Sequence, residues 1–484
     1  MAKKSVAKNY IYNLIYQILT IILPLITTPY LSRVLGAEAI GIYGYTLSIV
    51  TYFVLFGSLG IAMYGQREIA YLQNDKAKQS KVFWEIITIR IISLLMAIIT
   101  FYITFCINGE YTTYYKILIL ELIAGILDIS WYFQGIEDFG KTVIRNLIVK
   151  TLSLVSIFIF VKTQNDLWIY ILIYTLSNVL GNLTMWLYIP KMLKKVSIKT
   201  LEIKKHFKQI IALFIPQIAI QIYVVLDKTM IGNITQDMTE VGFYEQAQKI
   251  VRTMIVLVTA LGTVMNSRIA SAFSENKKEE IKNYLTQSFQ IVWFLGLPAM
   301  FGMIAVSSKF VPWFYGEGYE AVIPLINAMT PIILAIGLNN VTGVQYLIQA
   351  RKQKIFTLSV TIGAVINVIC NYILIKLNGT IGAVISSVLA EVSILVIQLI
   401  YIRKEIKILD MMKSSIKYFI SSLIMFGAIC FITTKMEVSI VNTGIQAIIG
   451  IVIYFSILFI LKDEFLKSIV NQLIVMVKGK IGKY

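Results

Sequence analysis

The stretch LSRVLG at residues 31–36, followed by GIY at residues 41–43, decides the fold because a similar stretch returns later in the chain. It returns as LDKTMIG at residues 226–232, followed by GFY at residues 242–244. Each copy ends an apolar segment that also holds a proline, which removes one backbone hydrogen bond and kinks a helix. These prolines are Pro24 and Pro216. We interpret the two stretches as copies of one helical hairpin; chance similarity between two apolar hairpins is the alternative.

Apolar segments long enough to cross a bilayer occur from end to end of the 484-residue chain. Hydrophobic residues make up 57% of the sequence and charged residues 14%, far from the balance of soluble domains. A helix needs about 20 residues to cross a hydrocarbon core of about 30 Å. We therefore predict an all-α polytopic membrane protein with about fourteen transmembrane helices. The approximate spans are 10–31, 41–62, 85–107, 117–135, 143–161, 167–189, 209–231, 250–267, 287–308, 321–340, 355–375, 380–402, 418–434 and 440–461.

The repeat predicts two parallel lobes. Because the hairpin copies begin at the ends of the first and the seventh predicted helices, six helices apart, the two lobes keep the same orientation in the membrane. We expect two six-helix lobes facing each other across a central cavity, which is the layout of rocking transporters. The predicted parts are an N-terminal lobe at 1–190, a basic cytoplasmic linker at 191–208, a C-terminal lobe at 209–402, helices thirteen and fourteen at 403–461, and a basic amphipathic cytoplasmic tail at 462–484.

Basic residues lie mostly on one side of the predicted topology. With the N-terminus in the cytoplasm, 33 Lys and Arg fall in inside segments, counting Arg145 at the edge of its span, and seven fall in outside loops. This positive-inside bias predicts a multi-pass membrane protein with both termini in the cytoplasm. It also explains the net charge of +18, because anionic headgroups attract cytoplasmic lysines, so no nucleic-acid partner is expected.

Few residues suit catalysis or metal binding. Cys106, Cys370 and Cys430 lie inside apolar segments, and the only histidine, His206, lies in a predicted lysine-rich loop. We therefore expect a transporter and not an enzyme, with no metal site and no cofactor. The sequence also lacks a P-loop, so an ion gradient, product removal or a partner must supply the energy. The coupling ion, if one is used, would be H⁺ or Na⁺.

Several motifs resemble those of the Wzx-type polysaccharide flippases. They are LPLITTPYLSRVLGAE at 23–38 with GIY at 41–43, YGQREIA at 64–70, WYFQG at 131–135, FIPQ at 214–217, VPWFYG at 311–316 and GTIGA at 379–383. The resemblance implies the fold of the multidrug/oligosaccharidyl-lipid/polysaccharide exporter superfamily. It also implies that the chain lies in a bacterial plasma membrane and moves undecaprenyl-pyrophosphate-linked oligosaccharides to the outer leaflet for capsule or cell-wall polysaccharide. The implied partners are this lipid-linked substrate, membrane lipids, and the polymerase and glycosyltransferases of the same pathway.

Charged residues inside predicted spans are the first candidates for a substrate site, since each costs several kcal/mol in lipid and normally faces protein or a water-filled cavity. Arg33 and Lys228 hold matching positions in the two hairpin copies. Both could donate charge-assisted hydrogen bonds to a pyrophosphate; the alternative is that they reach out to the outer membrane interface.

Polar side chains on two further helices extend this candidate site. Gln217, Gln221 and Lys228 share one face of predicted helix seven, with Asp227 beside them. On predicted helix eight, one polar face begins at Arg252 and continues through Thr259, Thr263 and Asn266. Arg252 could instead be an anchor at a helix end.

A second group of charges lies in the predicted N-terminal lobe. Glu121 and Asp128 follow one face of predicted helix four, and Arg90 and Lys150 on neighbouring helices are the available cations. Two carboxylates within a span need cations or protons nearby. The group is either a coupling site for H⁺ or Na⁺, a set of contacts to sugar hydroxyls, or a static ion-pair network between packed helices.

Two other functions remain as alternatives at this point. An ion-coupled drug or cation antiporter on the same fold would be expected to have a compact acidic pocket. A membrane glycosyltransferase or polymerase would need a substantial outer loop with catalytic groups. The longest predicted outer connection, 232–249, shows no obvious pair of acid and base residues.

Overall fold

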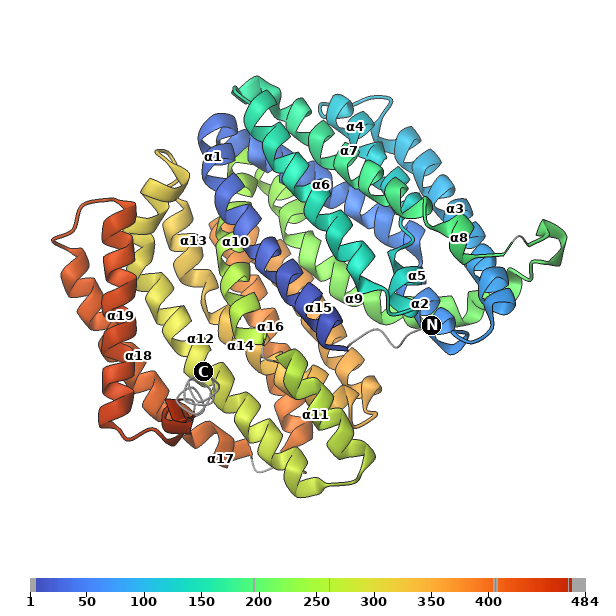
Figure 1. Cartoon of the computed structure of the whole chain (residues 1–484). Helices are drawn as coiled ribbons and strands as arrows, with labels where there is room; N and C mark the ends of the chain where they lie inside the picture. Colours follow the sequence, from blue (N-terminus) through green and yellow to red (C-terminus); the bar gives the residue numbers. More distant parts are fainter. Residues whose placement is uncertain are drawn as a thin grey trace, which may run out of the picture. The chain divides into compact units, whose positions relative to one another are not determined.

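The computed structural model describes residues 6–471 apart from 195, 261, 404, 406, 407 and 469, and its regular elements over these residues are all helices (Figure 1). Eleven helical segments among them are long and apolar enough to cross a membrane. The first, Ile22–Tyr71, extends over parts of two predicted spans. The all-α polytopic fold is therefore confirmed. The chain divides into two compact units, Met1–Glu245 and Gln246–Tyr484, which are described separately below.

The first unit contains helices α1 to α9 and the start of α10. Their bounds are α1 Val6–Ser58, α2 Ile61–Tyr71, α3 Lys76–Phe105, α4 Thr112–Leu127, α5 Ser130–Gly135, α6 Phe139–Phe160, α7 Leu167–Trp186, α8 Ile189–Met192, α9 Lys204–Thr235 and α10 Met238–Thr259, with short 3₁₀ turns at Gln164–Asp166 and Ile198–Thr200. The basic linker predicted at 191–208 thus contains short helical turns and the start of α9. The amphipathic tail predicted at 462–484 lies mostly outside the described residues.

The hairpin at the first repeat has no loop, which corrects the predicted separation of spans 10–31 and 41–62. The helix α1 runs through both spans and departs from helical geometry only at Gly36, whose φ is 79° and ψ is 170°. Glycine tolerates this conformation because it has no Cβ. The chain therefore changes direction at one residue.

The second repeat also turns more tightly than the sequence predicted. The α9 helix continues to Thr235 and α10 begins at Met238, so the long outer connection predicted at 232–249 is wrong. Glu240 and Glu245 are helical residues of α10 and not loop residues. This helix was not predicted because the segment is polar, and a search for long apolar segments finds only helices that face lipid or an apolar core.

The two hairpin copies pack against each other through their glycines. A Cβ added to Gly41 would lie 1.6 Å from the carbonyl oxygen of Met238, and one added to Gly242 would lie 2.0 Å from that of Ala37. Only glycine permits such a close approach of two backbones. The GIY and GFY motifs are therefore the contact point between the repeats within the first unit.

A second group of glycines shapes an aromatic core in the same unit. The indole of Trp131 covers Gly65, where a Cβ would come within 2.4 Å of the ring, and Gly135 packs against the carbonyl of Gln66. Phe83 stacks on Trp131 with ring centroids 5.5 Å apart. The motifs YGQREIA and WYFQG thus face each other as the packed surfaces of α2 and α5, and this core positions the polar network described below.

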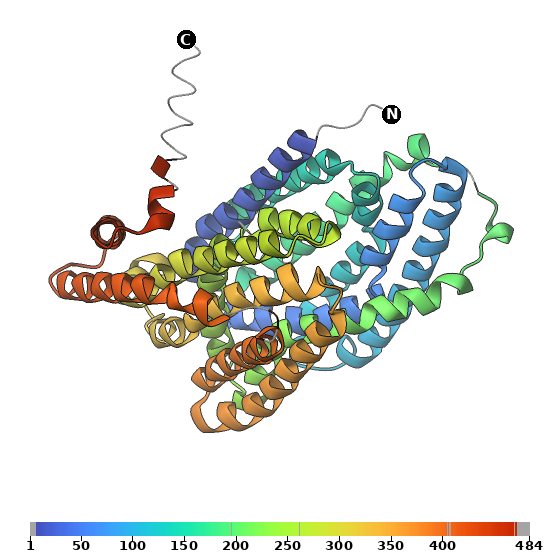
Figure 2. The same ribbon diagram turned by 90° about the horizontal axis from the view of Figure 1, so that it is seen from below.

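The second unit contains the end of α10 and helices α11 to α19. Their bounds are α11 Gly262–Ser274, α12 Lys278–Tyr315, α13 Val322–Met329, α14 Pro331–Asn339, a π-helix at Asn340–Ile348, α15 Gln353–Asn378, α16 Thr380–Ile402, α17 Ile408–Lys413, α18 Ser415–Thr433 and α19 Ile440–Ile460. The helices α15 and α16 run side by side in both views (Figure 2), and a Cβ at Gly382 would meet the carbonyl oxygen of Leu374 at 2.1 Å.

Buried polar side chains join the helices of the second unit. Thr342 donates to the side-chain oxygen of Gln398, whose amide donates to Ser359 at 3.0 Å. Asn339 donates to the carboxylate of Glu391 at 2.6 Å. Such bonds between helices replace the hydrophobic driving force that lipid does not supply. The α19 helix docks on α12 in the same way, through Tyr454 and the carbonyl of Phe294 at 2.8 Å.

Candidate substrate-binding site

Lys228 is ion-paired. Its Nζ lies 2.8 Å from Oε2 of Glu245 on α10, and the two side chains are only 12% and 13% exposed. Sequence reasoning placed Glu245 in a loop, so this partner was missed. The signal that could have found it is the spacing within the hairpin, where Asp227 and Lys228 are followed by Tyr244 and Glu245 on the returning helix. The carboxylate of Glu245 therefore neutralises the positive charge of Lys228 within the protein.

The neighbouring Asp227 belongs, with Lys228 and Glu245, to a line of polar contacts that we call the polar seam. Its carboxylate is buried and accepts a hydrogen bond from the hydroxyl of Tyr244. On the facing surface of α1, the Ser48 hydroxyl lies 2.8 Å from that of Thr229. The seam therefore continues from the α9–α10 hairpin onto α1, within the first unit.

Arg33 differs from its repeat-related partner. It lies on the exposed surface of α1 and donates through Nη1 to the carbonyl of Pro29 at 3.1 Å. Lys228, in contrast, is mostly buried against a carboxylate. The matching positions in the repeats thus carry unequal environments, and Arg33 is the cation of the two that a bulky anionic ligand reaches more easily.

The remaining residues of the predicted polar faces divide into three cases. Gln221 is exposed on α9, while Gln217 lies in the same helix with its side chain outside the described residues. Arg252 is exposed on α10 in the second unit. The polar face predicted from Arg252 to Asn266 is interrupted, because α10 ends at Thr259 and α11 begins at Gly262.

Arg90 binds the broken end of a helix. The prediction that Glu121 and Asp128 share one continuous helical face is wrong, because α4 ends at Leu127 and Asp128 lies in the break before α5. The Nε of Arg90 donates to the carbonyl of Gly125 at 2.6 Å, and its Nη2 lies 3.4 Å from Oδ2 of Asp128. Lys150 lies half-buried on a different helix, α6.

Two side chains of α7 complete this helix end. Asn182 donates to the carbonyl of Ala124 and Trp186 to that of Leu127, each at 2.8 Å. The last carbonyls of a helix lack partners inside the helix, and lipid offers none. Side chains therefore make the break tolerable within a span. This arrangement supports the static interpretation for Arg90 and Asp128.

Glu121 has a different environment from Asp128. It accepts a hydrogen bond from the amide of Asn178 on α7 at 2.8 Å. Asn178, Asn182 and Trp186 follow one another at intervals of one helical turn and form a polar stripe on an apolar helix. This stripe is visible in the sequence, and it is the signal that could have named Asn178 as a partner. A half-buried carboxylate held by a neutral amide is suited to binding a proton.

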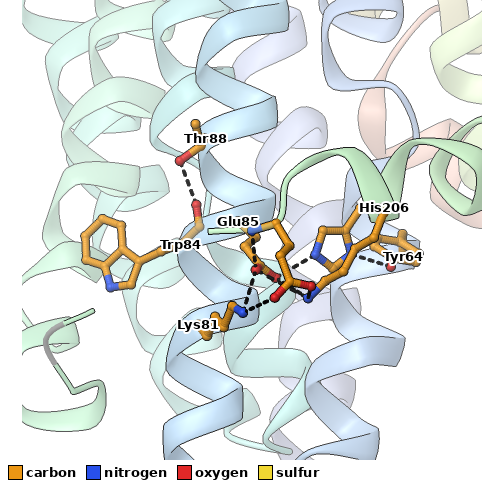
Figure 3. A network of polar contacts seen from close by, with 8 residues as sticks. Tyr64, Lys81, Trp84, Glu85, Thr88 and His206 are labelled. Carbon is orange, nitrogen blue, oxygen red and sulfur yellow. Dashed lines mark hydrogen bonds and ion pairs between the residues drawn. The ribbon is translucent and has the colours of Figure 1, made fainter. Parts of the chain in front are cut away.

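The only histidine lies inside the protein, which corrects its predicted place in a loop. His206 belongs to the first turn of α9 and is 3% exposed. Its Nε2 lies 2.8 Å from Oε2 of Glu85 on α3, and its Nδ1 lies 2.6 Å from the hydroxyl of Tyr64 on α2 (Figure 3). The sequence offered no hint of this cluster beyond the rarity of histidine.

Lysines and a second glutamate surround this histidine cluster. The Nζ of Lys205 lies 3.1 Å from Glu85. The Nζ of Lys81, which Figure 3 labels, lies 3.8 Å from the same carboxylate. The backbone N–H of Glu202 donates to Glu85 at 2.8 Å. The hydrogen bond from Lys81 and the charge of Lys205 lower the pKa of Glu202. Among the described residues, no group of histidine, cysteine and carboxylate side chains has the arrangement of a metal site.

Long apolar helices that bury ion pairs and capped helix breaks define a multi-pass membrane protein. The polysaccharide biosynthesis protein family matches residues 6–266, more than half of the chain, and the MatE family matches residues 212–373. The chain belongs to the polysaccharide biosynthesis protein family, and its resemblance to polysaccharide flippases is confirmed.

Individual relatives extend the similarity over most of the chain. A protein of Escherichia coli (strain K12) named as a putative O-antigen transporter is 24% identical over 406 residues, covering 83% of this chain and 97% of that protein. A protein of Haloferax volcanii named as a probable low-salt glycan biosynthesis flippase, Agl15, is 24% identical and covers 87% of this chain and 88% of its own length. The lipid II flippase MurJ of Bacillus subtilis (strain 168) is 27% identical over 56% of each chain.

Solved structures share the fold. The lipid II flippase MurJ in an inward closed conformation superposes with a TM-score of 0.77 at 17% identity, covering 95% of this chain and 100% of that one. An inward-facing multidrug resistance MATE transporter of the MOP superfamily gives a TM-score of 0.62 at 16% identity, covering 85% and 97%.

Proposed function

We propose that this protein is a flippase that moves undecaprenyl-pyrophosphate-linked oligosaccharide units from the cytoplasmic to the outer leaflet of a bacterial plasma membrane. The observation that carries the proposal is the similarity over nearly the whole length of a protein named as an O-antigen transporter. Relatives named as a lipid II flippase and as a probable low-salt glycan biosynthesis flippase support this substrate class over a drug or cation antiporter. The product serves capsule or cell-wall polysaccharide synthesis, and transport proceeds by alternating access.

The geometry adds a reason for an anionic headgroup. Arg33 presents a guanidinium on the exposed surface of α1, and a guanidinium fork matches the oxygens of a phosphate. Depleting the protein in its native host tests the function. Lipid-linked oligosaccharide is expected to accumulate in the cytoplasmic leaflet, and its sugar composition would identify the substrate. Normal export without accumulation would contradict the proposal.

The orientation of the chain can be tested with two single cysteines. The bias in basic residues places Ser197 of the linker in the cytoplasm and Asn108, between α3 and α4, outside. We expect an impermeant thiol reagent to label Asn108→Cys in intact cells and Ser197→Cys only after the membrane is opened. A cysteine-free parent chain is the control, and labelling of position 197 in intact cells would reverse the orientation.

Glu121 is the residue that we propose for proton coupling. A Glu121→Gln substitution keeps a side chain that can accept from Asn178 but cannot exchange a proton. We expect this variant to remain folded while export loses its dependence on the proton gradient. Arg90→Gln is the contrasting variant, because it removes the cap of α4 and should lower thermal stability. If Glu121→Gln exports with wild-type dependence on a proton gradient, Glu121 is not the coupling site. If export by the wild type depends on a sodium gradient instead, Na⁺ is the coupling ion.

A further inference from the structure

The hydrogen bonds of His206 determine which of its nitrogens carries a proton. Glu85 also accepts from the backbone of Glu202 and contacts Lys205, so its oxygens act as acceptors of a carboxylate. The Nε2 of His206 must therefore donate to Glu85. The Nδ1 then accepts the hydroxyl proton of Tyr64 when the ring is neutral.

A second proton can enter at one position only, Nδ1. When Nδ1 is protonated it becomes a donor, so the Tyr64 hydroxyl must turn its own proton away and accept instead. The ring then gains a positive charge at a site that is 3% exposed. The hydrogen bond between α2 and α9 thus reverses its direction with the protonation of one imidazole.

Charged groups on every neighbouring element act on this position. Glu85 on α3 favours the charged ring at 2.8 Å, and Lys205 on α9 and Lys81 on α3 oppose it. Glu202, before α9, pairs with Lys81. On α2, Arg67 lies 5.4 Å from the centre of the Tyr64 ring and contacts Glu68 at 3.1 Å. The two carboxylates equal the two lysines in formal charge, and Glu85 is the charged group that contacts the ring directly.

The position of the cluster gives the proton a mechanical consequence. His206 lies in the first turn of α9, directly after the basic linker, while its two partners belong to α2 and α3. We propose that Tyr64, His206 and Glu85 form a proton-binding site that latches the start of α9 onto α2 and α3. Protonation of His206 turns its contact with Glu85 into a charge-assisted hydrogen bond and strengthens the latch, so the linker end of α9 responds to acidification. This inference holds whatever substrate the protein carries.

The composition of the chain makes the site directly observable. Because the sequence contains one histidine, ¹⁵N-histidine labelling of the protein with a histidine-free tag reports on His206 alone. We expect the neutral ring to carry its proton on Nε2. In Tyr64→Phe, a protonated Nδ1 would lose its acceptor in a buried site, so the ring is expected to take up the second proton about one pH unit lower, the difference between a charge-assisted and a neutral hydrogen bond. Tyr71→Phe, which alters an exposed tyrosine of the same helix, is the matched control and should not change the titration.

Hydrogen–deuterium exchange measures the latch itself. After correction for the intrinsic pH dependence, the segment 202–210 is expected to exchange about three- to tenfold more slowly once His206 is charged, and faster than the wild type in Tyr64→Phe. A neutral ring protonated on Nδ1, or the same titration in wild type and Tyr64→Phe, would overturn the site. If Tyr64→Phe does not fold, the wild type still decides: exchange at 202–210 must follow the histidine titration, and exchange independent of it would reject the latch. Neither measurement involves transport, so failure here leaves the flippase proposal standing.

Discussion

Replacing Lys228 alone with glutamine is expected to destabilise the protein strongly. The substitution removes the ammonium group of a pair that is almost enclosed by the protein, while the carboxylate of Glu245 stays buried. Breaking a buried ion pair from one side costs about 3–5 kcal/mol, much more than a surface pair contributes. The double substitution Lys228→Gln with Glu245→Gln removes both charges and should recover most of the loss.

Thermal unfolding of purified protein checks this expectation. Lys228→Gln should melt well below the wild type, and the double variant should melt between them or close to the wild type. Equal melting of the single and double variants would mean that the pair is not coupled. Export by the double variant then distinguishes a structural role of Lys228 from a role in substrate binding. Retained export would mean that Lys228 is structural. Lost export in a stable protein would support its part in substrate binding.

The sequence predicted the spans well because apolarity over a helix length is a local property. The segments from α12 to α19 follow it directly. It failed where polar residues lie within buried helices, as at the start of α10. It also failed where one residue makes the turn, as at Gly36. In that case a helical pattern continues on both sides and no cluster of loop residues marks the break.

The partners of the candidate residues could not be predicted, because they depend on segments that are distant in sequence. Glu85 and His206 are 121 residues apart, and Glu121 and Asn178 are 57 apart. A sequence shows that a charge within a span needs a partner, but packing selects which one. The motifs that carry the family resemblance also proved to be largely structural, since Gly65 and Trp131 face each other in the core.

Arg33 is expected to be the residue whose charge matters most for transport. Its guanidinium lies on the exposed surface of α1, held near the backbone by the carbonyl of Pro29, and two of its N–H groups can engage two phosphate oxygens. Arg33→Glu should abolish export without preventing membrane insertion, because it places a negative charge where we propose that the pyrophosphate binds. Arg33→Lys should retain part of the activity, since lysine offers a single point of charge.

The neutral variant decides between substrate binding and anchoring at the membrane interface. A charge-assisted hydrogen bond contributes about 1.5–3 kcal/mol, so Arg33→Gln is expected to weaken substrate binding about ten- to a hundredfold. Lys376→Gln is the matched control, because Lys376 is an exposed basic residue at the end of a span that contacts the ring of Tyr372 and has no proposed role in transport. Export is measured at equal membrane abundance of each variant. If Arg33 only anchors α1 at the interface, both glutamine variants will export at the wild-type rate, and the pyrophosphate site must then be sought elsewhere, beginning with Arg252.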